Sequence, residues 1–490
     1  MRLDDLLRGI ASPPHGGIFV SGLTQDSQAV RAGDAFVALA GAKHHGIEFA
    51  DAAVAQGAVV VLAESGPGTR NPGPGSSPSP VIWIDNLRTH LGAIAARFYG
   101  NPSAAMTVVG VTGTSGKTST VQLLAQGFTR LGKRAATIGT LGAGLHGALH
   151  AGERTTPDVI RVHGLIAEFR NAGASDVAME VSSHALDQHR VDGIHFDVAV
   201  FTNLTRDHLD YHGTMEAYGA VKAKLFAWPG LRGAVINVDD AFGRELATRI
   251  PAGVRVLRCG IDNPDADVRA NDIHTHSDGI DFHLATPWGE APVHSALLGR
   301  FNVANLLAVA GVLGVLDVPF AQIRGVLEAL QPISGRMNRL GGGAVPLVVI
   351  DYSHKPDALE QVLAALRAHC DGKLVCVFGC GGERDAGKRP IMGAIAERMA
   401  DVVIVTDDNP RDENGDAIVA QIMAGMRAPE HATMMRDRAR AIDIAIAQAG
   451  AGDVVLVAGK GHETYQEVGG AKHPFDDLQV ARAALEARPC

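Results

Sequence analysis

The stretch VVGVTGTSGKTST, residues 108–120, decides the fold of the chain around it. An apolar run ends in glycines, and a lysine flanked by hydroxyl residues follows. This order predicts a buried strand, a turn whose N–H groups face one anion, and a helix whose dipole adds positive charge. Val111 stands where the pattern G-x-x-x-x-G-K-[ST] has its first glycine. The stretch predicts a phosphate loop made of Gly113, Thr114, Ser115, Gly116, Lys117, Thr118 and Ser119, with Lys117 on the outer phosphates and the Thr118 hydroxyl on Mg²⁺.

The composition excludes several classes of protein. The 490 residues are 46% hydrophobic and 20% charged, which is typical of globular domains with large cores. A net charge of −9 argues against a nucleic-acid partner. The apolar run 306–316 is shorter than the roughly 20 residues that a membrane helix needs, and the first residues lack the apolar stretch of a secretory signal. We therefore expect a cytoplasmic protein without membrane insertion, whose five scattered cysteines are reduced.

Apolar runs that end in polar turns recur along the whole chain. The central part contains TVVGVT, DVAMEV, DVAVFTN and AVINV, and the last part contains PLVVIDYSH, KLVCVFGCGG, DVVIVTDDNPR and DVVLVAGKGHE. Such runs, separated by helix-length stretches, predict α/β domains with mostly parallel, doubly wound sheets. The first part alternates similarly, and its segment 66–80, rich in Pro, Gly and Ser, predicts a surface loop. We expect three domains: a small α/β domain (1–103), a P-loop domain (104–335) and a third α/β domain (336–490).

Polar residues follow these strands, where ligands of parallel sheets bind. Glu180 ends a strand beside the phosphate loop, and a carboxylate there suits Mg²⁺. The loop FTNLTRDHLDYHG holds Asp207, His208, Asp210 and His212, which fit a metal site and a capped loop equally well. Lys222, in AYGAVKAKLF, is by itself typical of a solvated helix lysine.

The last part carries weaker signals of the same kind. GCGGERDAGKRP places basic residues around a glycine turn, which suits a carboxylate or phosphate. In TDDNPR, Pro410 fixes the turn that carries Arg411; a plain surface arginine remains the alternative. GKGHE adds Lys460, His462 and Glu463 at a further strand end.

Together the motifs resemble one family. In order along the chain they are GVTGTSGKTST, EVSSHALDQHRV, FTNLTRDHLDYHG, YGAVKAKLF, GRFNVANLL, SGRM, DYSHKPDAL, GCGGERDAGKRP, TDDNPR and GKGHE. This series closely resembles the Mur ligases, over nearly the whole chain. The resemblance implies a UDP-substrate-binding domain (1–103), an ATP-binding domain (104–335) and a Rossmann-like, amino-acid-binding domain (336–490).

The resemblance also implies a reaction. ATP would phosphorylate the D-glutamyl carboxylate of a UDP-muramoyl dipeptide, and the amine of meso-diaminopimelate would displace phosphate from the acyl phosphate. It implies two Mg²⁺ ions, a CO₂-derived carbamate on Lys222, small-molecule substrates and a monomer that takes part in peptidoglycan synthesis.

Site residues follow from the resemblance position by position. Besides Lys117, the catalytic and metal-binding residues would be Thr118 and Glu180 on the nucleotide-bound Mg²⁺, and His208 and carbamylated Lys222 on the second ion. Nucleotide contacts would include Asn302, Asn305, Arg336 and Asp351. UDP contacts would be Gln25, Ser27, Lys43, His44 and His45. The muramoyl peptide would meet Thr155, Thr156, Ser182, Gln188 and Arg190. The diaminopimelate site would comprise Arg384, Asp408, Asn409, Pro410, Arg411, Gly459 and Glu463.

Rival functions differ in what they require. A lysine-adding relative or a folylpolyglutamate synthase would run similar chemistry, but Arg411 suits an amino acid with a second carboxylate. A P-loop nucleoside kinase or switch-type NTPase would not need the basic strand-end turns of the third domain. A pure binding protein would leave the phosphate-type and Mg²⁺-type residues without purpose.

Overall fold

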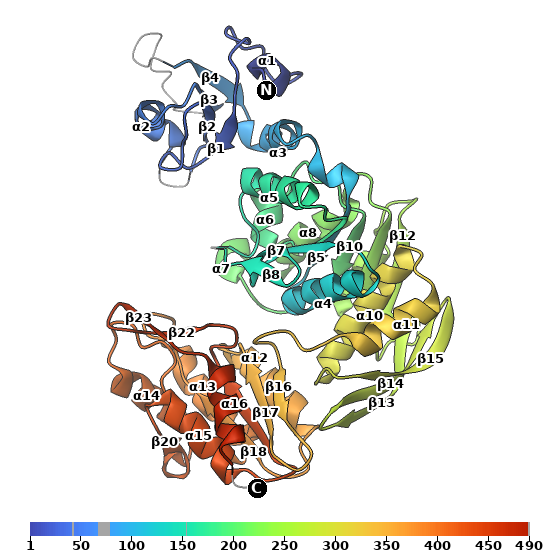
Figure 1. Cartoon of the computed structure of the whole chain (residues 1–490), viewed down its shortest axis with the longest axis vertical. Coiled ribbons are helices and arrows are strands. Elements are labelled where there is room, and N and C mark those ends of the chain that lie inside the picture. The colour runs from blue at the N-terminus through green and yellow to red at the C-terminus, as the bar shows by residue number, and fades with distance from the viewer. Residues whose placement is uncertain (42–43, 67–78, 153, 489–490) are drawn as a thin grey trace. The chain divides into compact units, whose positions relative to one another are not determined.

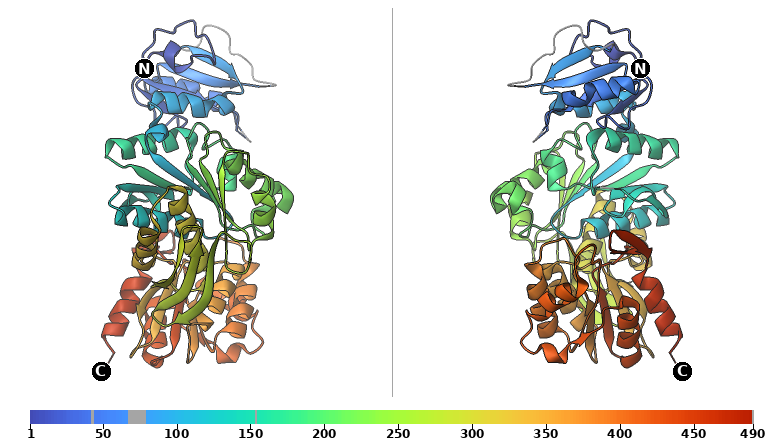
Figure 2. Two further views of the ribbon diagram at one scale, coloured as in Figure 1. Left: turned by 90° about the vertical axis from the view of Figure 1, so that its right-hand side faces the viewer. Right: turned by 90° about the vertical axis from the view of Figure 1, so that its left-hand side faces the viewer.

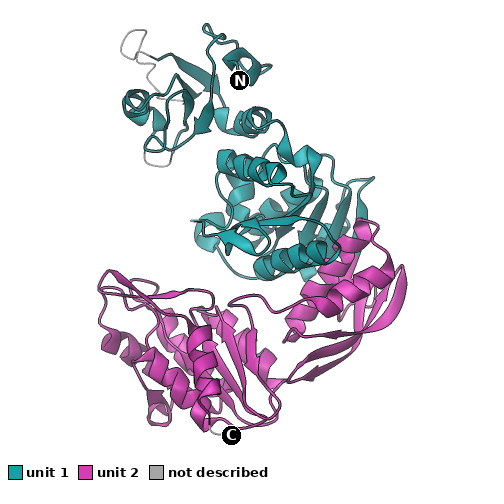
Figure 3. Ribbon diagram, in the orientation of Figure 1, with its two compact units in different colours: residues 1–257 teal, residues 258–490 magenta. Residues whose placement is uncertain are grey.

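The structure is a computed structural model that describes residues 1–41, 44–66, 79–152 and 154–488. It divides into two compact units, Met1–Leu257 and Arg258–Cys490 (Figure 3). The predicted surface loop 66–80 lies largely outside the described residues, since only its ends are included. The domain boundaries at 103 and 335 do not coincide with the division into units and stay a prediction.

The first unit begins with a small parallel sheet of order β1-β2-β3-β4, labelled in Figure 1. Its strands alternate between two cores: Val37, Val60 and Leu62 face one, while Phe36 and Val61 face the other. Burial on both faces explains why these runs are almost continuously apolar. The elements are α1 (Leu3–Leu6), β1 (Gly22–Thr24), β2 (Asp34–Ala38), η1 (Gly46–Phe49), α2 (Ala50–Ala55), β3 (Val60–Ser65), β4 (Val81–Asp85), α3 (Leu87–Phe98) and η2 (Pro102–Ala105).

The rest of the first unit is built on a sheet in which β5 pairs in parallel with both β10 and β9. The strand order in this unit is β11-β10-β5-β9-β6-β7-β8, with β7 and β8 antiparallel. The strands are β5 (Thr107–Thr112), β6 (Ala135–Gly139), β7 (Gly142–Leu145), β8 (Ala148–His150), β9 (Asp176–Glu180), β10 (Val198–Phe201) and β11 (Gly233–Asn237). The helices are α4 (Lys117–Arg130), α5 (Val159–Asn171), α6 (Ser183–Asp187), α7 (Leu209–His212), α8 (Met215–Ala223), η3 (Lys224–Ala227) and α9 (Ala241–Ala247).

The unit boundary falls within β12 (Arg255–Gly260), and the second unit opens with antiparallel strands that the sequence analysis did not predict. They are β13 (Val268–His276), β14 (Gly279–Thr286) and β15 (Gly289–Ser295). Helices α10 (Arg300–Val315) and α11 (Phe320–Ala329) pack against this sheet. The apolar run 306–316 lies almost wholly in α10 and is buried, as expected of a core helix.

The second unit ends in a sheet of order β16-β17-β21-β18-β19-β20. Successive residues Val375, Cys376, Val377 and Phe378 alternate between two separate cores, one on each face. Figure 2 shows helices on both faces of this sheet, as in a doubly wound fold. The strands are β16 (Asn338–Gly341), β17 (Leu347–Asp351), β18 (Leu374–Phe378), β19 (Val402–Val405), β20 (Thr433–Met434) and β21 (Val454–Ala458), followed by the hairpin β22 (Tyr465–Val468) and β23 (Ala471–Pro474). The helices are α12 (Pro356–Arg367), α13 (Lys388–Met399), α14 (Gly415–Met423), η4 (Pro429–His431), α15 (Arg438–Gln448) and α16 (Asp477–Glu486). The predicted α/β fold class is confirmed.

Candidate active site

The predicted phosphate loop lies between β5 and α4, and α4 begins at Lys117. Gly113 and Gly116 have φ values of 149° and 83°, which L side chains rarely adopt. A Cβ on Gly113 would lie 1.9 Å from Thr202 Oγ1, so this position admits glycine alone. The glycines therefore serve a backbone that turns tightly against the neighbouring strand.

The end of β10 fastens the loop. Asn203 O accepts the N–H of Thr114 at 2.9 Å, and Asn203 Oδ1 accepts the N–H of Ser115 at 2.9 Å. Thr202 Oγ1 donates to Ser115 O at 2.6 Å. Asn203 was not among the predicted site residues, although it follows the apolar strand of DVAVFTN at the end where polar residues were expected. These bonds fix the conformation of the loop backbone.

Two lysines share one acceptor at the loop. Lys117 Nζ and Lys222 Nζ each donate to Gly113 O at 2.8 Å. Lys222, from α8, is only 1% exposed, so the interpretation of a solvated helix lysine is wrong. Burial, and then the charge of Lys117, lower the pKa of Lys222 from 10.5 to about 6. Its neighbour Lys224, by contrast, is half-exposed and lies 3.6 Å from Asp187.

A buried carboxylate lies on the strand next to the loop. Glu180 ends β9, is 1% exposed, and pairs in register with Val111 of β5. Its Oε1 accepts the N–H of Thr140 at 2.8 Å, and its Oε2 accepts the Thr140 hydroxyl at 3.4 Å. Thr118, in the first turn of α4, is also buried. A buried carboxylate and a hydroxyl beside a phosphate loop supply the oxygen donors that Mg²⁺ prefers.

His208 belongs to an aromatic group beside Lys222. It has φ 54°, and its ring lies 4.9 Å from that of His184 and 6.2 Å from that of Tyr218. Lys222 Nζ lies 4.4 Å from the centre of the same Tyr218 ring. His212, by contrast, interacts with the Ser183 hydroxyl at 2.9 Å. His208 and Lys222 thus both lie against the Tyr218 ring, and His208 is also 3.6 Å from the carboxylate of Asp207.

The residues expected to meet the muramoyl peptide form a connected network. The Thr156 hydroxyl donates to Glu180 O at 2.8 Å and accepts the N–H of Ser182 at 3.2 Å. Arg190 donates to Thr156 O at 3.1 Å and, through Nε, to Gln188 Oε1 at 3.1 Å. The hydroxyl of Thr155 is 3.1 Å from that of Thr140, which also binds Glu180. The network therefore adjoins the carboxylate beside the phosphate loop.

The N-terminal sheet carries a cavity of about 360 Å³. Gln25, Ser27 and His44 line it, together with Phe36 and Phe49. His45 lies at the start of η1, where its Nδ1 accepts the N–H of Ile47 and its Nε2 is 3.0 Å from Glu64 O. Lys43 lies outside the described residues. The cavity thus combines polar groups and aromatic walls, as a nucleotide site needs.

In the second unit, the expected nucleotide contacts fall into two groups. Asn302 and Asn305 lie buried on α10, and Asn305 Nδ2 donates to Asn302 Oδ1 at 2.9 Å. Arg336 lies with Cζ 5.0 Å from the ring centre of Tyr352. Asp351 accepts the N–H groups of Met337 and Ser353, at 2.9 and 2.8 Å, and burial raises its pKa. Among the described residues, Arg336 Nε is a buried donor without a hydrogen-bond partner.

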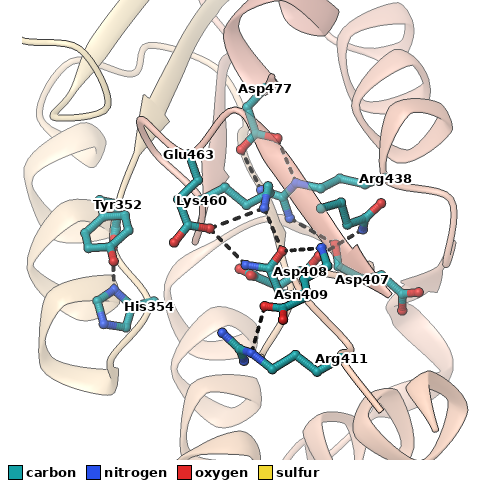
Figure 4. A network of polar contacts seen from close by, with 12 residues as sticks. Tyr352, His354, Asp407, Asp408, Asn409, Arg411, Arg438, Lys460, Glu463 and Asp477 are labelled. Atoms are coloured by element: carbon teal, nitrogen blue, oxygen red, sulfur yellow. Dashed lines mark hydrogen bonds and ion pairs between the residues drawn. The ribbon is translucent and has the colours of Figure 1, made fainter. Parts of the chain in front are cut away.

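The turns after β19 and β21 meet in the network of Figure 4. Asn409 Nδ2 donates to Glu463 Oε2 at 2.9 Å, and Lys460 Nζ donates to Asn409 Oδ1 at 2.9 Å. Gly459 has φ 117°, and a Cβ there would lie 2.3 Å from Asp408 Oδ2. Lys460 is fully buried, so these side chains form an ordered polar network at the carboxyl ends of the strands and are not solvated surface groups.

Arg411 extends this cluster on the turn that Pro410 precedes. Its Nε donates to Glu467 Oε2 at 3.1 Å and its Nη1 to Gly382 O at 2.7 Å, and its side chain is 18% exposed. The interpretation of Arg411 as a plain surface arginine therefore does not fit its burial and partners. Arg384 is exposed on the turn after β18.

Two buried arginines in this region have structural partners. Arg438 binds Asp477 bidentately, with both bonds at 2.7 Å and both side chains fully buried. Arg389 is 1% exposed and binds Glu413 at 2.6 and 2.7 Å. The Arg438–Asp477 pair was not predicted, because its members lie 39 residues apart and no local pattern indicates it. Arg389, one of the basic residues of GCGGERDAGKRP that were expected to bind a ligand anion, instead binds a carboxylate of the chain itself.

Comparisons with known proteins cover all of these regions. The family model for the Mur ligase middle domain matches residues 111–313, that for the Mur ligase glutamate ligase domain matches 335–461, and that for the Mur ligase family catalytic domain matches 19–99. A protein of Xanthomonas oryzae named UDP-N-acetylmuramoyl-L-alanyl-D-glutamate–2,6-diaminopimelate ligase is 58% identical over 100% of this chain and 98% of its own. A solved structure of a ligase with that name is 35% identical, with a TM-score of 0.76 and 99% of both chains covered. The MurF ligase from Thermotoga maritima in complex with ADP shares the fold, with 22% identity, a TM-score of 0.62, and 96% of this chain and 99% of its own covered.

Proposed function

Because the chain belongs to the Mur ligase family, we propose that it joins 2,6-diaminopimelate to the D-glutamyl residue of UDP-N-acetylmuramoyl-L-alanyl-D-glutamate. It is an ATP-dependent ligase that forms an amide bond in the synthesis of a peptidoglycan precursor. The observation that carries this proposal is the phosphate loop, where Lys117 and Lys222 bind the same carbonyl oxygen and the buried Glu180 ends the strand that pairs with β5. Relatives named for this reaction match the chain from end to end.

The chemistry explains why a phosphate loop is needed to make an amide. A carboxylate is a poor electrophile, so its oxygen must first be turned into a leaving group. ATP transfers its γ-phosphoryl group to the D-glutamyl carboxylate, giving an acyl phosphate and ADP. The amine of the incoming amino acid attacks the acyl carbon, loses a proton and expels phosphate. Transfer between two anions depends on charge neutralisation and positioning, and the loop N–H groups and Lys117 contribute both.

The residues present fit two Mg²⁺ ions. Thr118 and Glu180 would hold the ion bound to the nucleotide, and His208 with a carbamate on Lys222 would hold the second. Bound Mg²⁺ neutralises the charge on the phosphate oxygens during transfer. Glu180 is already held by Thr140, which fixes the carboxylate at the strand end.

The surroundings of Lys222 fit a carbamate. Two ammonium groups on the single acceptor Gly113 O would repel each other, and the lowered pKa leaves Lys222 as a neutral amine at neutral pH. A neutral amine is the form that attacks the carbon of CO₂, and its nitrogen then releases a proton to solvent. The product is an anion, which attracts Lys117 instead of repelling it and offers oxygen ligands to a metal.

The substrate positions follow the same division. The cavity at Gln25, Ser27 and His44 takes the uridine diphosphate, and the network around Thr156 and Arg190 takes the muramoyl peptide. In the second unit, the unpartnered Nε of Arg336 and the carboxylate of Asp351 take the nucleotide of ATP.

We further propose that the protein acts as a monomer in the cytoplasm, where ATP is available. Among the described helices, none is long and apolar enough to span a bilayer.

The amino-acid acceptor site would lie on the turns after β18, β19 and β21, with Arg384, Asp408, Asn409, Pro410, Arg411, Gly459 and Glu463. Diaminopimelate carries a carboxylate that lysine lacks, and an arginine fork binds a carboxylate bidentately. Arg411 is preorganised for this by Glu467 and Gly382 O, which fix its guanidinium on the turn. Lysine, the alternative substrate, lacks the distal carboxylate that Arg411 would bind.

The test compares kcat/KM for diaminopimelate and for lysine by phosphate release. Arg411→Ala should weaken diaminopimelate by about a hundredfold, the equivalent of about 2–3 kcal/mol for a charge-assisted contact, and weaken lysine much less. Arg398→Ala is the matched control, because Arg398 is an exposed arginine of the same unit paired with Glu360. If the ratio of the two kcat/KM values does not move toward lysine in Arg411→Ala, Arg411 is not the specificity residue. If the wild type prefers lysine, the alternative substrate replaces diaminopimelate.

A further inference from the structure

The antiparallel sheet β13–β15 carries a group of metal-ligand side chains that the proposed ligase reaction does not use. His276, Asp281 and His294 each offer one ligand atom, and these atoms all lie within 4.8 Å of one another. His276 Nε2 is 2.9 Å from Asp281 Oδ2, and His294 Nδ1 is 2.6 Å from Asp281 Oδ1. Among the described residues, no other such group of His, Cys, Asp and Glu is present.

The register of the sheet explains why these side chains converge. Asp281 of β14 pairs directly with His294 of β15, so both side chains stand on the same face of the sheet. The flanking residues Ile280 and Phe282 point to the opposite face and are buried. His276 ends β13, next to the turn into β14. Side chains from the three strands thus meet on the accessible face, above a packed core that fixes the strands.

We propose that His276, Asp281 and His294 bind a divalent transition-metal ion, with Zn²⁺ as the best match. Two imidazole nitrogens and a carboxylate oxygen are ligands that Zn²⁺ takes, at roughly 2.0–2.2 Å. Ligand atoms around such an ion stand about 3 Å apart, close to the two histidine–aspartate distances of 2.9 and 2.6 Å, and all three ligand atoms lie within 4.8 Å of one another. Three protein ligands leave a position for water. Mg²⁺ and Ca²⁺ prefer sites built from oxygen atoms, so this site discriminates against the ions proposed for the phosphate loop.

Such an ion would tie three strand ends together at a point that contacts the C-terminal part of the same unit. His276 O lies 2.6 Å from Nδ1 of His369, a residue that follows α12. His369 Nε2 accepts the N–H of Gly299 at 2.9 Å, so Nδ1 carries the proton and donates to His276 O. The Thr275 hydroxyl donates to Ala368 O at 2.6 Å. A metal ion on His276 would therefore stiffen both the turn between β13 and β14 and its contact with the segment after α12.

The test is a calorimetric titration of the full-length protein with ZnCl₂ in excess Mg²⁺, which occupies oxygen-rich sites. His294→Ala and the isosteric Asp281→Asn should each weaken Zn²⁺ binding. Loss of a group that only supports a metal ligand lowers affinity by about 10–100-fold, so loss of a ligand itself should lower it by at least as much. His283→Ala is the matched control, because His283 lies on the same strand two residues from Asp281 but outside the cluster. It should bind Zn²⁺ as the wild type does.

Co²⁺ provides a second measurement, since its visible absorption reports ligand number and geometry. Wild type and His283→Ala should develop a band of low-symmetry Co²⁺ that is absent in His294→Ala. Thermal melting without metal identifies any variant that fails to fold, and Asp281→Asn then serves in place of His294→Ala. Equal Zn²⁺ affinity in the wild type and both ligand variants would overturn the proposal and leave the cluster as two histidine–aspartate pairs. An equal loss in His283→Ala would overturn it too. Neither outcome bears on the ligase reaction.

Discussion

Replacing Lys222 with methionine should abolish activity and yet stabilise the protein at neutral pH. The substitution keeps most of the apolar stem of the side chain and removes the amine that is proposed to carry the carbamate. Lys222 is 1% exposed, and its pKa is lowered from 10.5 to about 6. If Lys222 were a solvated surface lysine, the same substitution would change neither activity nor stability.

The size of the effect follows from proton linkage. In the unfolded chain the amine stays protonated up to pH 10.5, whereas in the folded protein it is protonated only below about pH 6. Folding at pH 7 therefore requires Lys222 to release a proton. The release lowers the free energy of unfolding by about 1.4 kcal/mol for each pH unit below 10.5, or by about 5 kcal/mol in total. Methionine avoids this cost and loses one hydrogen bond, of about 1 kcal/mol. Gly113 O keeps its bond from Lys117, so no acceptor is orphaned. The net gain is about 3–4 kcal/mol.

The sign of the pH dependence is fixed by the same reasoning. Because the folded-state pKa is depressed, the wild type gains stability as pH rises from 6 toward 10.5. At pH 9.5 the cost of deprotonation falls to about 1.4 kcal/mol, so the advantage of the variant nearly disappears. Added bicarbonate should also narrow the gap, because CO₂ binds only the wild-type amine and stabilises it by mass action.

The assay is calorimetric unfolding at pH 7 and pH 9.5 in CO₂-free buffer, together with phosphate release. Lys224→Met is the matched control, because Lys224 is half-exposed on the same segment; it should shift stability by no more than about 0.5 kcal/mol at both pH values and stay active. A Lys222→Met protein that melts at or below the wild-type temperature at pH 7 would refute the buried, neutral lysine. Full activity would refute its part in catalysis.

Three further predictions concern the phosphate loop and the C-terminal core. Lys117→Ala should abolish phosphate release and leave the circular dichroism spectrum unchanged. Normal turnover in this variant would contradict the assignment of residues 113–119 as the phosphate-binding loop. Gly113→Ala should lower both stability and nucleotide binding, since its Cβ would meet Thr202 Oγ1 at 1.9 Å; an unaffected nucleotide affinity would contradict the geometry. Asp477→Asn should cost about 3–5 kcal/mol of unfolding free energy, because it leaves the charge of the fully buried Arg438 unpaired. A denaturation midpoint within error of the wild type would show that the pair is dispensable.

The phosphate loop was predictable because its information is local. Thirteen consecutive residues contain a strand, a glycine turn and the first turn of a helix. The backbone of that stretch itself forms the anion site. The α/β class was predictable for a related reason, since strands buried on both faces must be apolar almost throughout. The strands β13–β15 escaped prediction because one of their faces is accessible, so their runs mix histidine and aspartate with apolar residues.

By itself, the sequence determined which residues could serve phosphate, metal and carboxylate chemistry, and in what order they come along the chain. The tertiary structure decided which of them are buried and charged. Lys222 is typical of a surface lysine on its own helix, and its pKa falls only because the fold buries it and places the charge of Lys117 nearby, 105 residues earlier in the chain. Likewise, His276, Asp281 and His294 form a cluster only through strand register. A residue's solvation and its neighbours are properties of the packed chain, and these set a pKa or complete a metal site.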